Sequence, residues 1–209
     1  MAEDKEAPFR AKGLERLLGI TDDVFAFAIT LLVLDLVTPV TSGPATNSSL
    51  AAAMAQEYLP FVSFAVSFWV ASLLWLSHHR IFQYIKSSDT RLLSLNLLFL
   101  FFVVLIPFAT RVLEEYESVQ LAILLFAIPQ IGASSMNSII WRHATRSDLT
   151  DERTSQRTIR WFWLRGLLGA LMFALSVLLA FIQTDIAVAS WFAIPPALVL
   201  LDRRFGRRA

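Results

Sequence analysis

The sequence predicts an all-α membrane protein with six transmembrane helices. The chain of 209 residues is 56% hydrophobic and only 17% charged, whereas soluble globular domains are typically ~45–50% apolar and ~25% charged. Six apolar segments take up nearly all of the chain, and each approaches the roughly 20 residues that a helix needs to cross the hydrocarbon core of a bilayer. This composition leaves no room for a soluble catalytic domain.

The distribution of Lys and Arg predicts which way the chain crosses the membrane. All of these residues except Arg111 lie before the first apolar segment, in the gaps after the second and fourth, or after the sixth. Cytoplasmic loops retain Lys and Arg, whereas translocated loops lack them. We therefore expect both termini in the cytoplasm, with a cytoplasmic N-terminal segment over 1–15, a six-helix transmembrane domain over 16–201 and a basic tail over 202–209.

Proline and loop residues delimit the first three helices. The first is expected over 16–38 and ends before Pro39, because a residue that precedes proline disfavours the helical conformation. A polar external loop follows as far as residue 49 and leads to a second helix over 50–77. The third helix is expected over 90–113, with a kink at Pro107.

The last three helices surround a charged connector. The fourth is expected over 118–141 and contains Pro129 and a run of small residues, 132–135, that suits close helix packing. The connector covers 142–159 on the cytoplasmic side. The fifth helix is expected over 160–183 and the sixth over 185–201, with two consecutive prolines inside the latter.

Several chemistries are excluded by what the sequence lacks. The chain has no cysteine, which excludes disulfides, thiolate catalysis and cysteine-based metal sites. It contains no phosphate-binding glycine motif and no G-x-S-x-G nucleophile elbow, and it has no TVGYG stretch for a carbonyl-lined potassium filter. We expect no enzyme activity, no metal, no cofactor and no nucleic-acid partner.

The first helix carries unusual acidic residues. Asp22, Asp23 and Asp35 interrupt its apolar sequence, and an ionisable residue within a span costs ~2.5–3.5 kcal/mol on insertion scales, which makes it a candidate for function. The alternative interpretation is that Asp22 and Asp23 mark the membrane interface and pair with Arg16.

An apolar stripe follows the acids on the same helix. Phe27, Leu31 and Leu34 share one face at i, i+4 and i+7, with Thr30 on its flank and Asp35 near the outer end. Periodicity alone does not separate a packing seam between helices from the lining of a pore.

Two adjacent histidines, His78 and His79, close the second helix. Neighbouring residues point in different directions on a helix, so this pair lacks the i, i+4 spacing of a zinc site. They are either hydrogen-bonded interfacial histidines or members of a buried polar network with Asp22 and Arg16.

Three stretches carry a resemblance to a known family: 16–36 (RLLGITDDVFAFAITLLVLDL), 75–79 (WLSHH) and 88–98 (SDTRLLSLNLL), the last continuing to Ile-Pro-Phe at 106–108. Together they resemble the transmembrane protein 175 family of endolysosomal-type potassium channels and its bacterial branch, which carries six helices per chain. Two departures stand out. The family's F-S-D becomes Ile20-Thr21-Asp22, and Phe27 replaces the usual aliphatic constriction.

The resemblance implies a homotetramer in which four copies of the first helix line a central pore. It assigns the hydrophobic rings to Phe27, Leu31 and Leu34, and ion selectivity to Thr30. It further implies a network at the base of this helix, formed by Arg16, Asp22 and one of the two histidines, His78 or His79.

We therefore expect a potassium-selective or potassium-preferring cation channel in the plasma membrane of a bacterium. Its partners would be its own copies, the lipid bilayer and permeant monovalent cations. The hydrophobic rings would gate by dewetting, and Asp35 would concentrate cations at the outer mouth. The alternatives are a proton-coupled secondary transporter that uses Asp22 and Asp23, and a membrane enzyme or assembly protein without transport.

Overall fold

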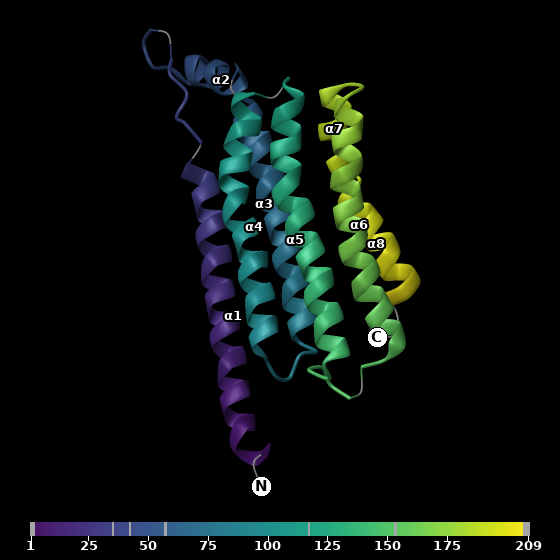
Figure 1. The fold of residues 1–209 in the computed structure, drawn as a ribbon. Helices are drawn as coiled ribbons and strands as arrows, with labels where there is room; N and C mark the ends of the chain where they lie inside the picture. Colours follow the sequence, from purple (N-terminus) through teal and green to yellow (C-terminus); the bar gives the residue numbers. More distant parts are fainter. Residues whose placement is uncertain are drawn as a thin grey trace.

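The computed structural model describes residues 3–34, 36–41, 43–56, 58–116, 118–152 and 154–206 as a bundle of helices (Figure 1). Its elements are, in order, α1 (Glu3–Leu34), α2 (Asn47–Gln56), α3 (Tyr58–Phe82), α4 (Thr90–Glu115), α5 (Gln120–Arg146), α6 (Gln156–Ala180), α7 (Thr184–Trp191), α8 (Ile194–Leu201) and the π-helical turn η1 (Asp202–Gly206). Six stretches are long and apolar enough to cross a membrane, as the sequence predicts, and the sixth joins α7, α8 and η1.

Several helices begin or divide at places that differ from the sequence predictions. The helix α1 begins at Glu3 and ends at Leu34, so it includes most of the expected N-terminal segment 1–15. The expected second helix is divided into α2 and α3, and the expected sixth helix into α7 and α8. Proline explains both divisions, because Pro60 lies in the first turn of α3 and Pro195 in that of α8, where a missing N–H breaks no helical hydrogen bond.

The helices α4 and α5 form the centre of the bundle. Buried residues make up 44% and 50% of their most apolar windows, against 17–33% in the other spans. The helix α1 packs on α4 and α3, while α6 packs on α5 from the other side. Figure 1 shows α1 at one edge of the bundle and α6 to α8 at the opposite edge. One side of α1 is therefore left uncovered in the protomer.

Small residues allow α5 and α6 to approach closely. A Cβ atom added at Gly166 would overlap the hydroxyl of Ser138, and one added at Gly169 would lie 3.1 Å from the hydroxyl of Ser134. This is the close packing by small side chains that helices use within membranes. The predicted run of small residues contributes Gly132 as well, which packs beneath the ring of Phe102 on α4.

The two connections rich in basic residues are fastened together at one end of the bundle. Ile85 and Thr150 form an antiparallel bridge, and the amide of Lys86 donates to the carbonyl of Leu149 at 2.9 Å. The N-terminus of α1 and the C-terminal end of the described chain lie toward the same end (Figure 1). The basic gaps therefore lie together, as their sorting along the sequence predicts.

A capping carboxylate joins α4 to α5 at this end. Asp89 accepts a hydrogen bond from the amide of Leu92 at 2.7 Å and one from Nε2 of His143 at 2.9 Å. Burial alone would raise the pKa of Asp89, but these two hydrogen bonds and the positive charge of His143 together hold it below its usual value of 3.8. The carboxylate therefore stabilises the fold in its ionised form.

We predict a pH-dependent effect of the substitution Asp89→Asn. Asparagine caps a helix as well as aspartate does, so the variant loses only the charge. Because the folded-state pKa is lowered, the charge stabilises the protein above pH 3.8 and this contribution is lost as the pH falls through the lowered pKa. In thermal unfolding the variant should melt below the wild type at pH 7 and together with it in strong acid.

The exposed Asp148 provides the control, since its left-handed φ of 53° suits asparagine equally well. Asp148→Asn should leave the melting temperature unchanged at both pH values. An Asp89→Asn deficit of the same size at pH 7 and in strong acid would contradict the assigned role of the charge.

Candidate functional site

One face of α1 is buried against α3 and α4. With 3.6 residues per turn, the buried residues recur at intervals of three and four along a single side of the helix, and they are Leu17, Thr21, Phe25, Ala28 and Leu32. Phe25 also meets the ring of Phe99 on α4, with centroids 5.8 Å apart. This face fixes the rotation of α1 about its own axis.

The opposite face of α1 carries most of the residues predicted to line a pore. Phe27 is 66% exposed and Leu34 is 74% exposed, and Thr30 is exposed between them. Leu31 is half-buried and turned toward α4, where it lines a groove of about 360 Å³ together with Phe27 and Val104. The structure thus places Thr30 near the middle of the outward face and Leu31 on its flank, whereas the helical periodicity had suggested the reverse.

The hydroxyl of Thr30 is held by the helix itself. Its Oγ1 donates a hydrogen bond to the carbonyl of Phe27 at 2.8 Å. The proton is therefore directed inward, which leaves the lone pairs of this oxygen free to accept from another group. Asp23 is exposed on the same side of α1 and lines the groove beside Phe27. Asp35, predicted at the pore mouth, lies outside the described residues.

A buried chain of polar groups connects three helices behind this face. His78 on α3 is only 1% exposed, and its Nε2 lies 2.8 Å from Oδ1 of Asn96 on α4. The amide nitrogen of Asn96 donates to Oγ1 of Thr21 on α1 at 2.9 Å, and Thr21 donates to the carbonyl of Leu17 at 2.8 Å. Since a carbonyl oxygen only accepts, His78 must carry its proton on Nε2.

Asp22 belongs to a second polar group nearer the surface. Its carboxylate accepts a hydrogen bond from the indole nitrogen of Trp75 at 2.9 Å. The ring of Trp75 stacks on His79 with centroids 5.2 Å apart. The two histidines therefore have separate roles in the packing, His78 in the buried chain and His79 on the ring of Trp75.

The predicted partnership of Arg16 with Asp22 does not appear as an ion pair between the described side chains of this protomer, and Arg16 is exposed. The sequence analysis anticipated neither Asn96 and Thr21 as partners in the buried chain nor Trp75 as the partner of Asp22. An amide such as Asn96 in the middle of an apolar span was the available signal. Within the described ranges, no three His, Asp or Glu side chains gather as metal ligands would.

We predict that Asn96→Leu destabilises the protein strongly. The variant would leave both His78 and Thr21 buried without their partner, and each unsatisfied buried group costs about 1–3 kcal/mol. Thermal unfolding in detergent should show a clear loss of stability. Ser94→Ala, an exposed site on the same helix, should change the free energy of unfolding by less than about 0.5 kcal/mol, and an equal effect of both substitutions would contradict the importance of the buried chain.

Comparison with known proteins places this arrangement in a family. The sequence profile described as "Endosomal/lysosomal potassium channel TMEM175" matches residues 16–107, which include most of α1, all of α2 and α3, and most of α4. A potassium channel of Streptomyces collinus is 32% identical over 180 residues, covering 84% of this chain and 86% of that protein. A potassium channel of Chamaesiphon minutus is 26% identical, covering 90% and 94%.

The fold agrees with solved structures. The crystal structure of a lysosomal potassium-selective channel TMEM175 homolog from Chamaesiphon minutus matches with a TM-score of 0.75 at 24% identity, over 90% of this chain and 97% of that one. The human endosomal/lysosomal proton channel TMEM175 is 29% identical over a region that covers 77% of this chain and 32% of the human protein.

These relatives are ion channels and not enzymes. Their similarity, together with six apolar helices long enough to cross a bilayer, makes the chain a multi-pass membrane protein that acts as a cation channel. Because the Streptomyces relative shares 32% identity over most of both chains, the protein belongs to the TMEM175 channel family.

Proposed function

We propose that this protein forms a homotetrameric, potassium-preferring channel in a bacterial plasma membrane, with four copies of α1 around a central pore and both termini in the cytoplasm. The names of its bacterial relatives support potassium as the permeant ion. The sorting of Lys and Arg supports the orientation. The pore is inferred from the residues on the side of α1 that no other helix of the protomer covers.

That face combines apolar and polar residues at membrane depth. Phe27 and Leu34 alone could face lipid, but Asp23 and Thr30 are exposed on the same side, within the span that extends from Gly13 to Leu34. A carboxylate in hydrocarbon costs ~2.5–3.5 kcal/mol on insertion scales, so such residues usually face a bundle interior or a water-filled cavity. Around a four-fold axis, the same face would instead border a shared aqueous path.

The gate is assigned to the apolar side chains of this face. Four Phe27 rings at one level, with Leu34 and Leu31 toward the outer side, would make a constriction that excludes water, and an ion passes only when water re-enters. Phenylalanine is bulkier than the aliphatic residue usual in the family, so opening would require a change of rotamer or a rotation of α1.

Selectivity is assigned to Thr30. Because its proton is bound to the carbonyl of Phe27, its oxygen can face a cation with free lone pairs. Four such oxygens would replace part of the hydration shell of a potassium ion. Asp35 would concentrate cations at the outer mouth through the field of four carboxylates, and the groups around Asn96 and Trp75 would hold the base of α1 in position.

The alternative function is a proton-coupled secondary transporter that uses Asp22 and Asp23. It differs from a channel in kinetics, because carrier flux saturates with substrate and depends on a proton gradient. Potassium flux into liposomes should therefore be measured with and without a pH difference. Non-saturating flux that is independent of the pH difference supports the channel, and saturating flux that requires it supports the transporter.

We predict that Phe27→Asn increases potassium flux in reconstituted liposomes. A polar ring would let water wet the constriction, and each ~1.4 kcal/mol removed from the barrier increases a rate about tenfold. The matched control is Leu171→Asn on the exposed side of α6, at the opposite edge of the bundle from α1 (Figure 1). Flux that is unchanged by Phe27→Asn, or raised equally by both variants, would remove Phe27 from the gate.

We also predict that Thr30→Val lowers the preference for potassium over sodium. Valine keeps the shape of threonine but removes the oxygen, whereas Thr30→Ser retains it. Flux measured under potassium and then sodium gradients should give ratios that converge in Thr30→Val and stay close to the wild type in Thr30→Ser. An unaltered ratio in Thr30→Val would show that selectivity resides elsewhere.

A further inference from the structure

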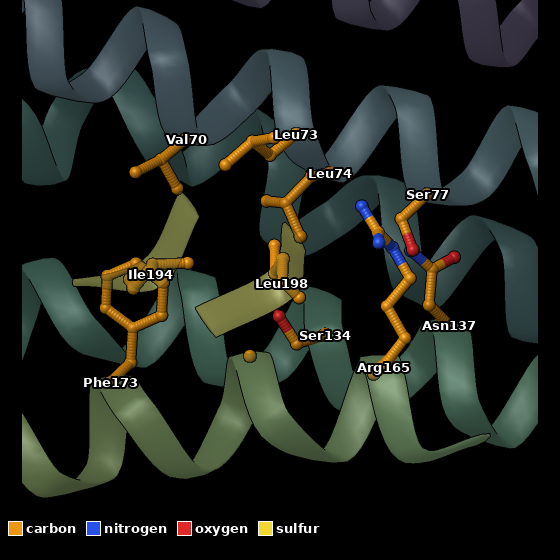
Figure 2. A pocket seen from close by; sticks show the side chains of 12 residues that line it. Val70, Leu73, Leu74, Ser77, Ser134, Asn137, Arg165, Phe173, Ile194 and Leu198 are labelled. Carbon is orange, nitrogen blue, oxygen red and sulfur yellow. The ribbon is translucent and has the colours of Figure 1, made fainter. Parts of the chain in front are cut away.

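A small cavity lies away from α1, where α3, α5, α6 and α8 meet (Figure 2). Its two ends differ in chemistry. One end is apolar and is lined by Val70, Phe173 and Ile194, while Ser77, Asn137 and Arg165 come together at the other. The glycines of the α5–α6 contact, including Gly166 and Gly169, also border it.

Two buried polar atoms at the polar end have no hydrogen-bond partner within the described part of the chain. They are Oδ1 of Asn137 and Nε of Arg165, on residues that are 1% and 6% exposed. A buried polar atom left unsatisfied costs about 1–3 kcal/mol, and native proteins satisfy nearly all such atoms with protein groups or ordered water. The two atoms therefore indicate a bound polar ligand.

The charge of Arg165 is already balanced on its other side. Its Nη1 donates to both carboxylate oxygens of Asp202, at 2.7 and 2.8 Å. Trp161 also donates to this carboxylate at 3.2 Å, and Arg80 lies 3.7 Å from it. Arg165 thus already has a carboxylate partner, and a cation beside its guanidinium would be repelled.

The ligand must accept one hydrogen bond and donate another. Nε of Arg165 is a donor and Oδ1 of Asn137 is an acceptor, so a molecule between them needs both capacities. Water has both, whereas a halide ion can only accept. The cavity offers about 40 Å³ to the centres of water molecules, and one water requires roughly 10–15 Å³ counted in this way.

We propose that this cavity is a structural water site, in which a bound water bridges Arg165 on α6 to Asn137 on α5 and completes its hydrogen bonds with Ser77 on α3. The water joins three helices in the half of the protomer that contains α6 to α8. This site is independent of the proposed pore.

The test is a structure of the full-length protein in lipid nanodiscs at a resolution that shows ordered water. The expected result is a density peak within hydrogen-bond distance of both Nε of Arg165 and Oδ1 of Asn137. A direct hydrogen bond between these two residues, or continuous hydrocarbon density in the cavity, would overturn the proposal. Crystals grown in bromide extend the test, because an anomalous peak at this place would identify an anion and exclude water.

Variants provide a matched comparison. Asn137→Leu should abolish the peak, since the water loses its acceptor. Gln130→Leu replaces another buried polar residue of α5 that does not line the cavity and should retain it. A peak that persists in Asn137→Leu would overturn the bridging role. If that variant does not fold, the wild-type density and the bromide data still decide between water, anion and direct contact.

Discussion

A helix that crosses hydrocarbon cannot present a carboxylate to lipid without a penalty of ~2.5–3.5 kcal/mol. The outward side of α1 presents Asp23, with Thr30 less than two turns away. The rotation of α1 that produces this exposure is fixed by residues such as Phe25 and Leu32, which are buried against the other helices. The packing that buries one face of α1 therefore also exposes the opposite face, and the exposed face is the one that we propose lines the pore.

The same penalty applies to polar side chains inside the protomer, but these are buried among its helices. Several buried polar side chains are partnered by a side chain of another element, as Thr21 is by Asn96 and Arg165 is by Asp202. Thr110 on α4 likewise donates to Ser67 on α3 at 2.8 Å. Hydrogen bonds across helices are a recurring means of association in a bilayer, where apolar surface gains little by burial. These pairs fix which helices are neighbours and leave α1 a single polar side that is not covered.

Much of the fold could be predicted from the sequence, because the bilayer restricts spanning segments to a narrow range of length and composition. The six spans and the end at which the basic connections gather follow from that restriction. The extension of α1 back to Glu3 does not, since polar residues outside the hydrocarbon carry no hydropathy signal. The division at Pro195 was also missed, because a proline within an apolar run is compatible with a kink or with a new helix.

The candidate site was predictable only in part. Periodicity identified Phe27 and Leu34 as members of one face. The rotation of α1 about its axis, however, depends on its packing against α4, and in the structure Thr30 lies on the outward face while Leu31 lies on its flank. The choice between His78 and His79 was undecidable from adjacent positions, because it depends on Asn96, which is distant in sequence. Asn137 and Arg165 belong to different spans, and only the folded bundle brings them to the same cavity.

Whether the outward face of α1 meets water decides most directly whether this helix lines a pore. The natural chain has no cysteine, so Leu34→Cys and Leu171→Cys each introduce a single thiol, and only a hydrated thiol ionises and reacts readily with a charged, membrane-impermeant thiol reagent. If α1 lines the pore, the reagent modifies Leu34→Cys and reduces its potassium flux, while Leu171→Cys on the exposed side of α6 remains unmodified. A Leu34→Cys variant that is as unreactive as Leu171→Cys would place this face of α1 against lipid and contradict its role in lining a pore.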